Sequence, residues 1–426
     1  MQRRPCCIRL SIVLALLGAT GAVLAQSPAQ PLERELGSSL KSVLAFVEAR
    51  NPELRAMGYE SDAAQQRLRG AGALPDPIVS MELRDIPFSE PTLSPANAGN
   101  TRYALRQMFP LGDKRELRRG IAAAEASVAD AKRGAVVAET RMRAKTAYSQ
   151  YWYAAQAQRV TQSLRAVMSD LEQVARARYA SGLTPQQDVI KAQTELTGLR
   201  ADLVMLGSER RQAAARLNGV LARPADAPLA EPNELRPIPA GALDFASLTK
   251  TAAERSPTLA MNAAQIAAAD RNAQLMRASR TPDLGVGAAV IQKGTRLTDY
   301  ELMVEINIPW QTDIIRANVN EAVAMSDAAA ARRDATAAQL QSELGQNWAA
   351  LDALREQGEI VRATLLPQVE LTYEAALASY QTGRVDFATL LDAQRQIRRT
   401  RLDLLKIELE QQMRLAEIER IVGEDL

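Results

Sequence analysis

Two hydrophobic patterns alternate along the chain and predict its elements. Over long stretches, apolar residues recur every three or four positions, as in the series Leu340, Leu344, Trp348 and Leu351, and this spacing is typical of helices that pack along one face. Two such stretches, 114–179 and 313–380, would each be about 100 Å long as helices. Because a helix of that length cannot bury its apolar stripe alone, we expect a hairpin partner and neighbouring helices.

Short stretches in which apolar and other residues alternate predict four strands, of which the second is less regular and the last is the most regular. In it, Leu302, Val304, Ile306 and Ile308 alternate with mostly polar residues. A four-stranded sheet in a bilayer would leave its edges unpaired, and membrane barrels begin at about eight strands. We therefore predict that these four residues face lipid and that two or three copies close a barrel. A soluble antiparallel sheet packed on helices is the alternative.

The elements follow the same order in each half of the chain. Each half is expected to hold short helices, two strands, one long helix, a glycine turn and a further helix. The first repeat covers residues 26–221, a linker rich in proline and alanine covers 222–242, and the second repeat covers 243–426. The fold class is therefore mainly α with a small β part, built from two internal repeats.

A glycine turn interrupts each long helical pattern, and the two turns match at one constant offset. Glycine tolerates the positive φ that a tight reversal between antiparallel helices needs. We expect the two turns to form the working tip of the molecule. The matched residues are Tyr179, Gly182, Ala192 and Gln193 in the first turn and Tyr380, Gly383, Ala393 and Gln394 in the second.

Composition excludes several classes of function. The chain has no histidine, and its two cysteines, Cys6 and Cys7, both precede the first apolar run. A Ser-His-Asp triad, a Cys-His pair and a structural zinc site are therefore excluded. The 52 basic and 50 acidic residues nearly balance, which does not favour nucleic-acid binding. We expect no enzyme, no cofactor and no metal site.

The first 25 residues are predicted to be a secretory signal peptide. Arg3, Arg4 and Arg9 precede an apolar run at 10–24, and the chain offers a cleavage point after Ala25. The run is shorter than the roughly 20 apolar residues of a membrane-spanning helix. No cysteine follows it, so a lipid anchor through cysteine is not expected in the mature chain.

Four short motifs and their order resemble those of the TolC-like outer-membrane factor family. The likeness covers essentially the whole chain after the signal peptide, and it rests on the order and duplication of motifs that are weak singly. The motifs are Ala73-Leu74-Pro75-Asp76-Pro77, Phe109-Pro110-Leu111-Gly112, Leu365-Leu366-Pro367 and the two Tyr-x-x-Gly turns.

This resemblance implies an architecture and a set of partners. It implies a homotrimer with a 12-stranded β-barrel in the outer membrane, continued by an α-barrel through the periplasm. The duct would carry substrates away from an inner-membrane pump, of the RND type, and a periplasmic adaptor protein. The turns would form the periplasmic entrance, where the adaptor docks at Gly182, Leu183, Gly383 and Arg384.

The resemblance also implies a gate at the second turn. Asp392 matches one of two aspartates that ring the constriction in TolC, and Thr389 occupies the position of the other. Asp188 and Tyr380 match an aspartate and a tyrosine that hold the gate shut, so we expect them to form a contact. The latch also contains an arginine, whose position is occupied by Val385 in this chain, next to Arg384.

The alternatives concern cargo and class. Within the family, the chain resembles the heavy-metal efflux branch, CzcC-like and CusC-like. This resemblance favours metal cations as cargo. Drugs, solvents or the proteins of type I secretion remain open. A soluble periplasmic coiled-coil scaffold or an adaptor is the rival of another class. An adaptor would carry one hairpin within Gly-rich β segments, and two complete hairpins oppose it.

Overall fold

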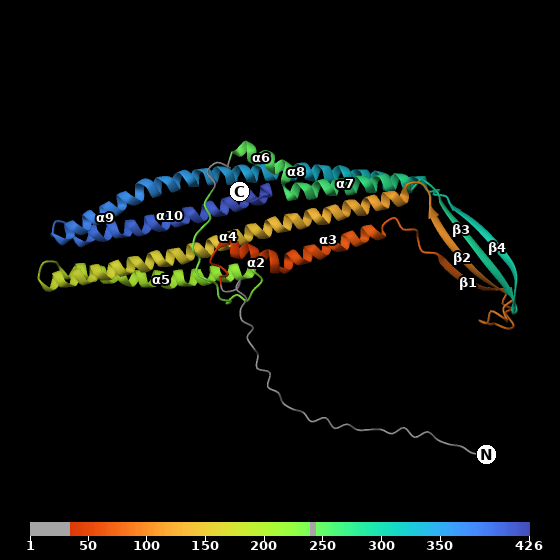
Figure 1. Cartoon of the computed structure of the whole chain (residues 1–426), viewed down its shortest axis with the longest axis horizontal. Helices are drawn as coiled ribbons and strands as arrows, with labels where there is room; N and C mark the ends of the chain where they lie inside the picture. The colour runs from red at the N-terminus through yellow and green to blue at the C-terminus, as the bar shows by residue number, and fades with distance from the viewer. Residues whose placement is uncertain (1–34, 239–243) are drawn as a thin grey trace, which may run out of the picture.

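The computed structural model describes residues 35–238 and 244–426. The predicted signal peptide, residues 26–34 of the first repeat and linker residues 239–242 lie outside the described residues. The predicted mainly helical class with a small sheet is confirmed. Figure 1 shows the sheet at one end of an elongated molecule and two helical hairpin tips at the other.

Helices and strands follow in a similar order in the two halves, and a π-helical segment divides the long helix of the second half. The first half holds α2 (Leu40–Arg50), α3 (Pro52–Gly70), β1 (Ile78–Arg84), β2 (Asn100–Pro110), α4 (Lys114–Ala180) and α5 (Gln186–Val220). The second half holds α6 (Phe245–Arg255), α7 (Pro257–Ala278), β3 (Asp283–Lys293), β4 (Arg296–Asn307), α8 (Thr312–Ile360), a π-helical segment (Val361–Leu365), α9 (Leu366–Gln381) and α10 (Phe387–Val422). With 67 residues, α4 is about 100 Å long and runs from the sheet to the tip.

Four antiparallel strands form one sheet in the order β1-β2-β3-β4. The central pair, β2 and β3, joins the two halves of the chain. Strands β1 and β4 each pair on one side, which leaves an edge at both ends of the sheet within one chain. Unpaired edges of this kind are open to pairing with another chain.

The two faces of the sheet differ in chemistry. One row across the four strands consists of Val79, Leu105, Ala288 and Leu302. Val79 and Leu302 are 78% and 80% exposed, and Val304 and Ile306, the next residues on this face of β4, are also exposed.

The opposite face carries ion pairs. Arg102 of β2 reaches Glu301 of β4 at 2.8 Å, and Arg106 reaches Glu305 at 2.8 Å. Small residues of the intervening strand, among them Gly285 and Ala289, leave room for these arginines. An exposed apolar face opposite a charge-paired face matches the predicted alternation.

One of the four residues predicted on the last strand lies beyond it. Strand β4 ends at Asn307, so Ile308 follows the strand, although it is exposed like the other three. The next residue, Pro309, has no backbone N–H and cannot continue the ladder. The partner strand also begins only at Asp283, which pairs with Asn307.

Proline shapes the long helix of the second half. Pro367 cannot donate to the carbonyl four residues earlier, and a proline inside a helix displaces the preceding turn. The chain accommodates it with the five-residue π-helical segment just before α9. The helix is therefore irregular at Pro367, where it forms a wider helical turn.

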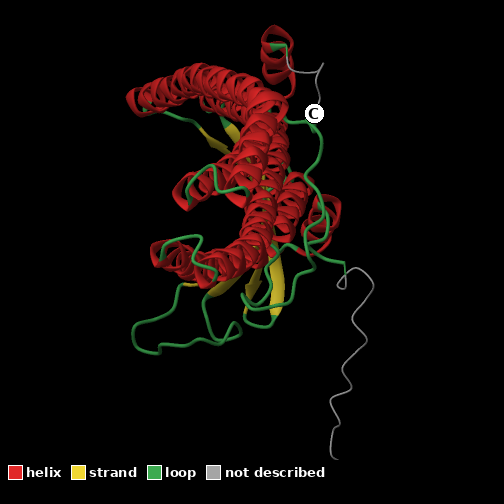
Figure 2. Cartoon of the chain, turned by 90° about the vertical axis from the view of Figure 1, so that its left-hand side faces the viewer, coloured by secondary structure: helices red, strands yellow, loops and turns green. Residues whose placement is uncertain are grey.

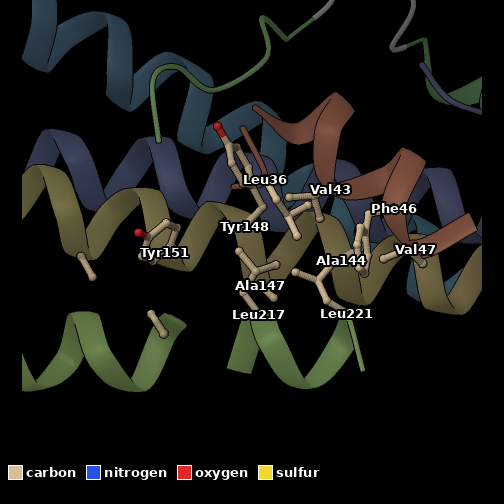
Figure 3. Close-up of a cluster of buried hydrophobic side chains, with 12 residues drawn as sticks. Leu36, Val43, Phe46, Val47, Ala144, Ala147, Tyr148, Tyr151, Leu217 and Leu221 are labelled. Carbon is tan, nitrogen blue, oxygen red and sulfur yellow. The ribbon is translucent and has the colours of Figure 1, made fainter. Parts of the chain in front are cut away.

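The helices pack as a curved layer, which Figure 2 shows nearly end-on. A core near the middle of the molecule joins α2, α4 and α5, with Val43, Phe46 and Val47 of α2 set against Tyr148 of α4 and Leu217 of α5 (Figure 3). The Tyr148 hydroxyl lies 3.1 Å and 3.2 Å from the carbonyl oxygens of Glu234 and Ser38.

A buried ion cluster connects the two halves with the linker. Lys145 of α4 and Glu419 of α10 are 4% exposed each, and Lys145 Nζ lies 2.7 Å from Glu419 Oε2. Arg236 of the linker donates to both oxygens of Glu419, at 2.6 Å and 2.7 Å. Charges buried this deeply need partners, and this cluster supplies them from three segments.

Candidate functional site

The two hairpin tips have the same backbone turn. Gly182 and Gly383 have φ of +69° and +73°, as expected of glycines at a reversal. In the first turn the amide of Leu183 donates to Arg178 O at 2.9 Å, and in the second the amide of Arg384 donates to Ser379 O at 2.9 Å. This bond pattern closes helices through a left-handed glycine, so both turns end their helices alike.

The residues predicted to dock an adaptor lie on the surface of these turns. Leu183 is 67% exposed, Arg384 is exposed, and a side chain added at Gly182 would meet open space. An exposed leucine on the first turn and an exposed arginine on the second suit a mixed apolar and polar contact. The docking role of these four residues stays a prediction.

The side chains of the two tips pack into one apolar cluster, the tip cluster. It includes Met168, Leu171 and Ala175 of α4, Val189, Ala192 and Leu199 of α5, Ala376 and Tyr380 of α9, and Phe387, Leu390, Leu391 and Ala393 of α10. Burial of these side chains stabilises the association of the two hairpins.

Tyr380 lies at the centre of the tip cluster. It is 1% exposed, and its ring meets Phe387 edge-on with centroids 5.5 Å apart. Its hydroxyl has no hydrogen-bond partner among the described residues. Burial raises the pKa of Tyr380, and the charge of Asp188 raises it further while Arg178 opposes the shift. No hydrogen bond therefore joins Tyr380 to Asp188 among the described residues, although the charge of Asp188 acts on the Tyr380 hydroxyl.

Asp188 is buried in the first turn of α5. It is 7% exposed, and burial is the main cause that raises its pKa. The charge of Asp386 raises the pKa of Asp188 as well, while Lys191 and Arg178 lower it. A carboxyl group held this way is easier to protonate than an ordinary aspartate.

Thr389 and Asp392 have different surroundings from this pair. Thr389 donates from its amide and from its hydroxyl to Asp386 Oδ1, at 3.0 Å and 2.7 Å, and so completes the cap of α10. Its place in the structure is that of a capping partner. Asp392 is exposed and lies 3.9 Å from Arg395 of its own helix. The structure thus brings Tyr380 and Asp188 together and leaves Asp392 on the surface.

Sequence reasoning missed Arg178 at this site. Its Nη1 donates to Gln381 O at 2.8 Å, and its guanidinium carbon lies 5.1 Å from the ring centroid of Tyr380. The contact links the last turn of α4 to the last turn of α9. Basic residues are common in the last turn of a helix, so the pattern alone gives no sign that this one reaches another hairpin.

Further along, charged contacts join α10 to α5. Arg395 donates to Glu195 Oε2 from two nitrogens, at 3.0 Å and 2.7 Å, and Arg398 lies 2.7 Å from Asp202. Glu195 is 8% exposed, so the carboxylate of the first pair is shielded although Arg395 is half exposed, and Asp202 of the second pair is on the surface. A two-point arginine contact fixes geometry more firmly than a surface pair does.

Two kinds of feature are absent from residues 35–238 and 244–426. None of the helices in these ranges is both long and apolar enough to cross a membrane. Within the same ranges, no group of three or more His, Cys, Asp or Glu side chains is placed to hold a metal ion.

Long paired helices, a small sheet with one exposed apolar face and tips closed by glycine turns define the class of outer-membrane channel proteins. The model of the family "Outer membrane efflux protein" matches residues 44–223 and 248–424, and the chain belongs to this family. The predicted family is therefore confirmed. Its members are efflux channels of the outer membrane.

Individual relatives agree with this assignment. The chain is 23% identical to the cobalt-zinc-cadmium resistance protein CzcC of Cupriavidus metallidurans, over 97% of this chain and 98% of that one. Its fold is similar to that of the outer-membrane channel OprN, with a TM-score of 0.76, 17% identity and coverage of 90% and 89%. It is also similar to CusC, with a TM-score of 0.75, 15% identity and coverage of 90% and 92%.

Proposed function

We propose that the chain is the outer-membrane exit duct of a tripartite efflux system. The exposed apolar face of the sheet, with Leu302, Val304 and Ile306 on its edge strand, carries this proposal. Apolar side chains of this number are rarely left to water, and lipid is a suitable neighbour for them. The opposite face, with its ion pairs, suits the water-filled interior of a barrel.

The duct is a homotrimer in this proposal. One chain supplies four strands with two open edges, and three copies would close a 12-stranded barrel without any edge. The helices give further support, because exposed large hydrophobic side chains on α5 and α9 would be covered by neighbouring copies. They are Ile190, Val204 and Met205 on α5 and Leu371 on α9.

The tips face the periplasm and meet the adaptor protein, which links the duct to an inner-membrane pump of the RND type. Their exposed Leu183 and Arg384 support a docking surface. The gate lies at the same end. Three copies of the exposed Asp392 would form a ring of carboxylates around the axis, and such a ring attracts cations.

Heavy-metal cations are the cargo that we propose. The relative named for cobalt, zinc and cadmium resistance supports this choice. A duct does not need a resident metal site in order to pass metal ions. Drugs, solvents or secreted proteins are the other outcomes of the test below.

Complementation of a deletion strain with wild-type and variant proteins provides the test. Wild type should restore growth on cobalt, zinc or cadmium, and Val304→Asp should not, because a charge on the lipid face of a barrel costs up to a few kcal/mol depending on depth. Met303→Asp is the matched control, since Met303 is the adjacent residue on the opposite face. Full membrane insertion of Val304→Asp would contradict the duct, whereas rescue from drugs but not metals would change only the cargo.

A further inference from the structure

One arginine serves the ends of two helices. Arg178 lies in the last turn of α4, and its Nη1 donates to the carbonyl of Gln381, the last residue of α9. Free carbonyls at a helix C-terminus carry partial negative charge, which a guanidinium group stabilises. No basic residue lies in the last turn of α9, and the residue that matches Arg178 there is Ser379. The second hairpin therefore obtains this charge from the first.

The same guanidinium group covers the central aromatic ring of the tip cluster. It lies over Tyr380, whose ring in turn packs on Phe387. A cation over an aromatic face is attracted to it, most strongly where water is excluded, and Tyr380 is 1% exposed. To separate the hairpins at the tip, both the hydrogen bond to Gln381 and this stacking contact must break.

We propose that Arg178 is the positioning residue that clamps the two hairpins together and holds the periplasmic end of the duct closed. This inference rests on the proposed function. Arg178 joins the two turns directly, whereas the hydroxyl of Tyr380 makes no hydrogen bond in the described part of the chain. The first hairpin thus supplies the arginine that joins the tips, and the closed state does not require an arginine at position 385.

Three variants of the full chain test the clamp. Arg178→Ala removes it, and Arg178→Lys keeps the charge but loses the planar stacking group. Arg176→Ala is the matched control, because Arg176 lies two residues away, is exposed and pairs with Glu172 of its own helix at 2.6 Å. Hydrogen exchange at 178–186 and 379–390 and opening of single channels in planar bilayers are measured for each.

Arg178→Ala should raise exchange at both turns about tenfold, which corresponds to about 1.4 kcal/mol, and should increase the fraction of time the channel is open. Arg178→Lys should lie between wild type and Arg178→Ala, and Arg176→Ala should behave as wild type. Equal exchange in Arg178→Ala and Arg176→Ala would overturn the clamp, as would faster exchange with unchanged opening. A wild-type protein without conductance would overturn the proposed function instead, and exchange at the two turns would then decide the clamp by itself.

Discussion

The two hairpin tips have the same backbone conformation but differ in which side chains they bury. Both contain a glycine with positive φ and the same pair of closing hydrogen bonds. The matched tyrosines have opposite environments, however, because Tyr179 is 45% exposed and Tyr380 is 1% exposed. The first tip supplies Arg178 to the contact between the hairpins, and the second tip supplies the ring and the carbonyl that receive it.

The polar groups that follow the two turns differ in the same way. Helix α10 begins with a side-chain cap from Asp386, whereas α5 begins after Pro185 without one. Gln193 donates to Glu172 at 3.2 Å, but the side chain of its match, Gln394, is buried with no partner among the residues described. The two turns therefore have the same backbone conformation, whereas their side chains make different contacts.

The largest expected effect is the loss of the buried tyrosine. Tyr380→Ala should lower the local free energy of opening at the tip by about 3–5 kcal/mol, because it leaves a cavity in the tip cluster and removes the stacking partner of Arg178. Tyr179→Ala should change it by less than about 0.5 kcal/mol, as expected of an exposed residue. Hydrogen exchange at the second turn measures the change in this free energy for both variants. Changes of equal size would contradict the difference in environment between the two tyrosines.

The sequence predicted the parts of this fold that depend on local pattern. Glycine at the two matched turns and alternation along β4 each act through their own neighbours, so a single sequence reveals them. The contacts between hairpins could not be predicted this way. Arg178 and Gln381 are far apart in the chain, and nothing in the residues around either one identifies the other.

The candidate gate shows the same limit. The family resemblance predicts a contact between Asp188 and Tyr380, and the charge of Asp188 is one of the causes that raise the pKa of Tyr380. Among the described residues the Tyr380 hydroxyl has no hydrogen-bond partner, because burial of the ring does not by itself set the direction of a hydroxyl group. The resemblance predicts Thr389 at the gate. In the structure its hydroxyl donates to Asp386 in a local N-cap, a contact that the resemblance does not imply.

The two turn glycines should respond alike to substitution. Gly182→Ala and Gly383→Ala should each cost about 1–2 kcal/mol, since an alanine in the left-handed region is strained whatever space surrounds it. A Cβ at Gly383 would lie 3.5 Å from Arg178, an ordinary contact, and a Cβ at Gly182 would meet nothing within 4 Å. Thermal unfolding with local hydrogen exchange gives both values. A much larger cost at Gly383 alone would show that the clamp also depends on this turn.

Two acidic groups at the tips should give opposite pH dependence. The pKa of Asp188 is raised, mainly by burial, so Asp188 lowers stability at neutral pH and this loss disappears as pH falls through its folded pKa. The pKa of Asp386 is lowered, mainly by the Thr389 hydroxyl, so its contribution is present above the unfolded pKa and is lost as pH falls through the folded pKa. Both pKa values are shifted from an ordinary value of 3.8.

Hydrogen exchange near each residue, followed from neutral to acidic pH, separates the two groups. The start of α5 should become more protected on mild acidification, and the start of α10 should lose protection only at lower pH. Asp188→Asn should remove the first change and leave the second. If both segments lost protection together in wild type, the buried state of Asp188 would be refuted.

The smallest expected effect distinguishes the clamp from a latch built on a tyrosine hydroxyl. A latch in which Tyr380 donates to Asp188 would lose about 1.5–3 kcal/mol in Tyr380→Phe, the worth of a hydrogen bond to a charged group. In the structure this hydroxyl is buried without a partner, so its removal should change the stability of the tip by about zero or stabilise it slightly. The phenyl ring keeps its place over Phe387 and under Arg178, and the clamp should persist. Single-channel recording and tip exchange of Tyr380→Phe beside Arg178→Ala give the answer. Frequent opening in Tyr380→Phe would mean that the closed assembly gives the hydroxyl a partner which one chain does not.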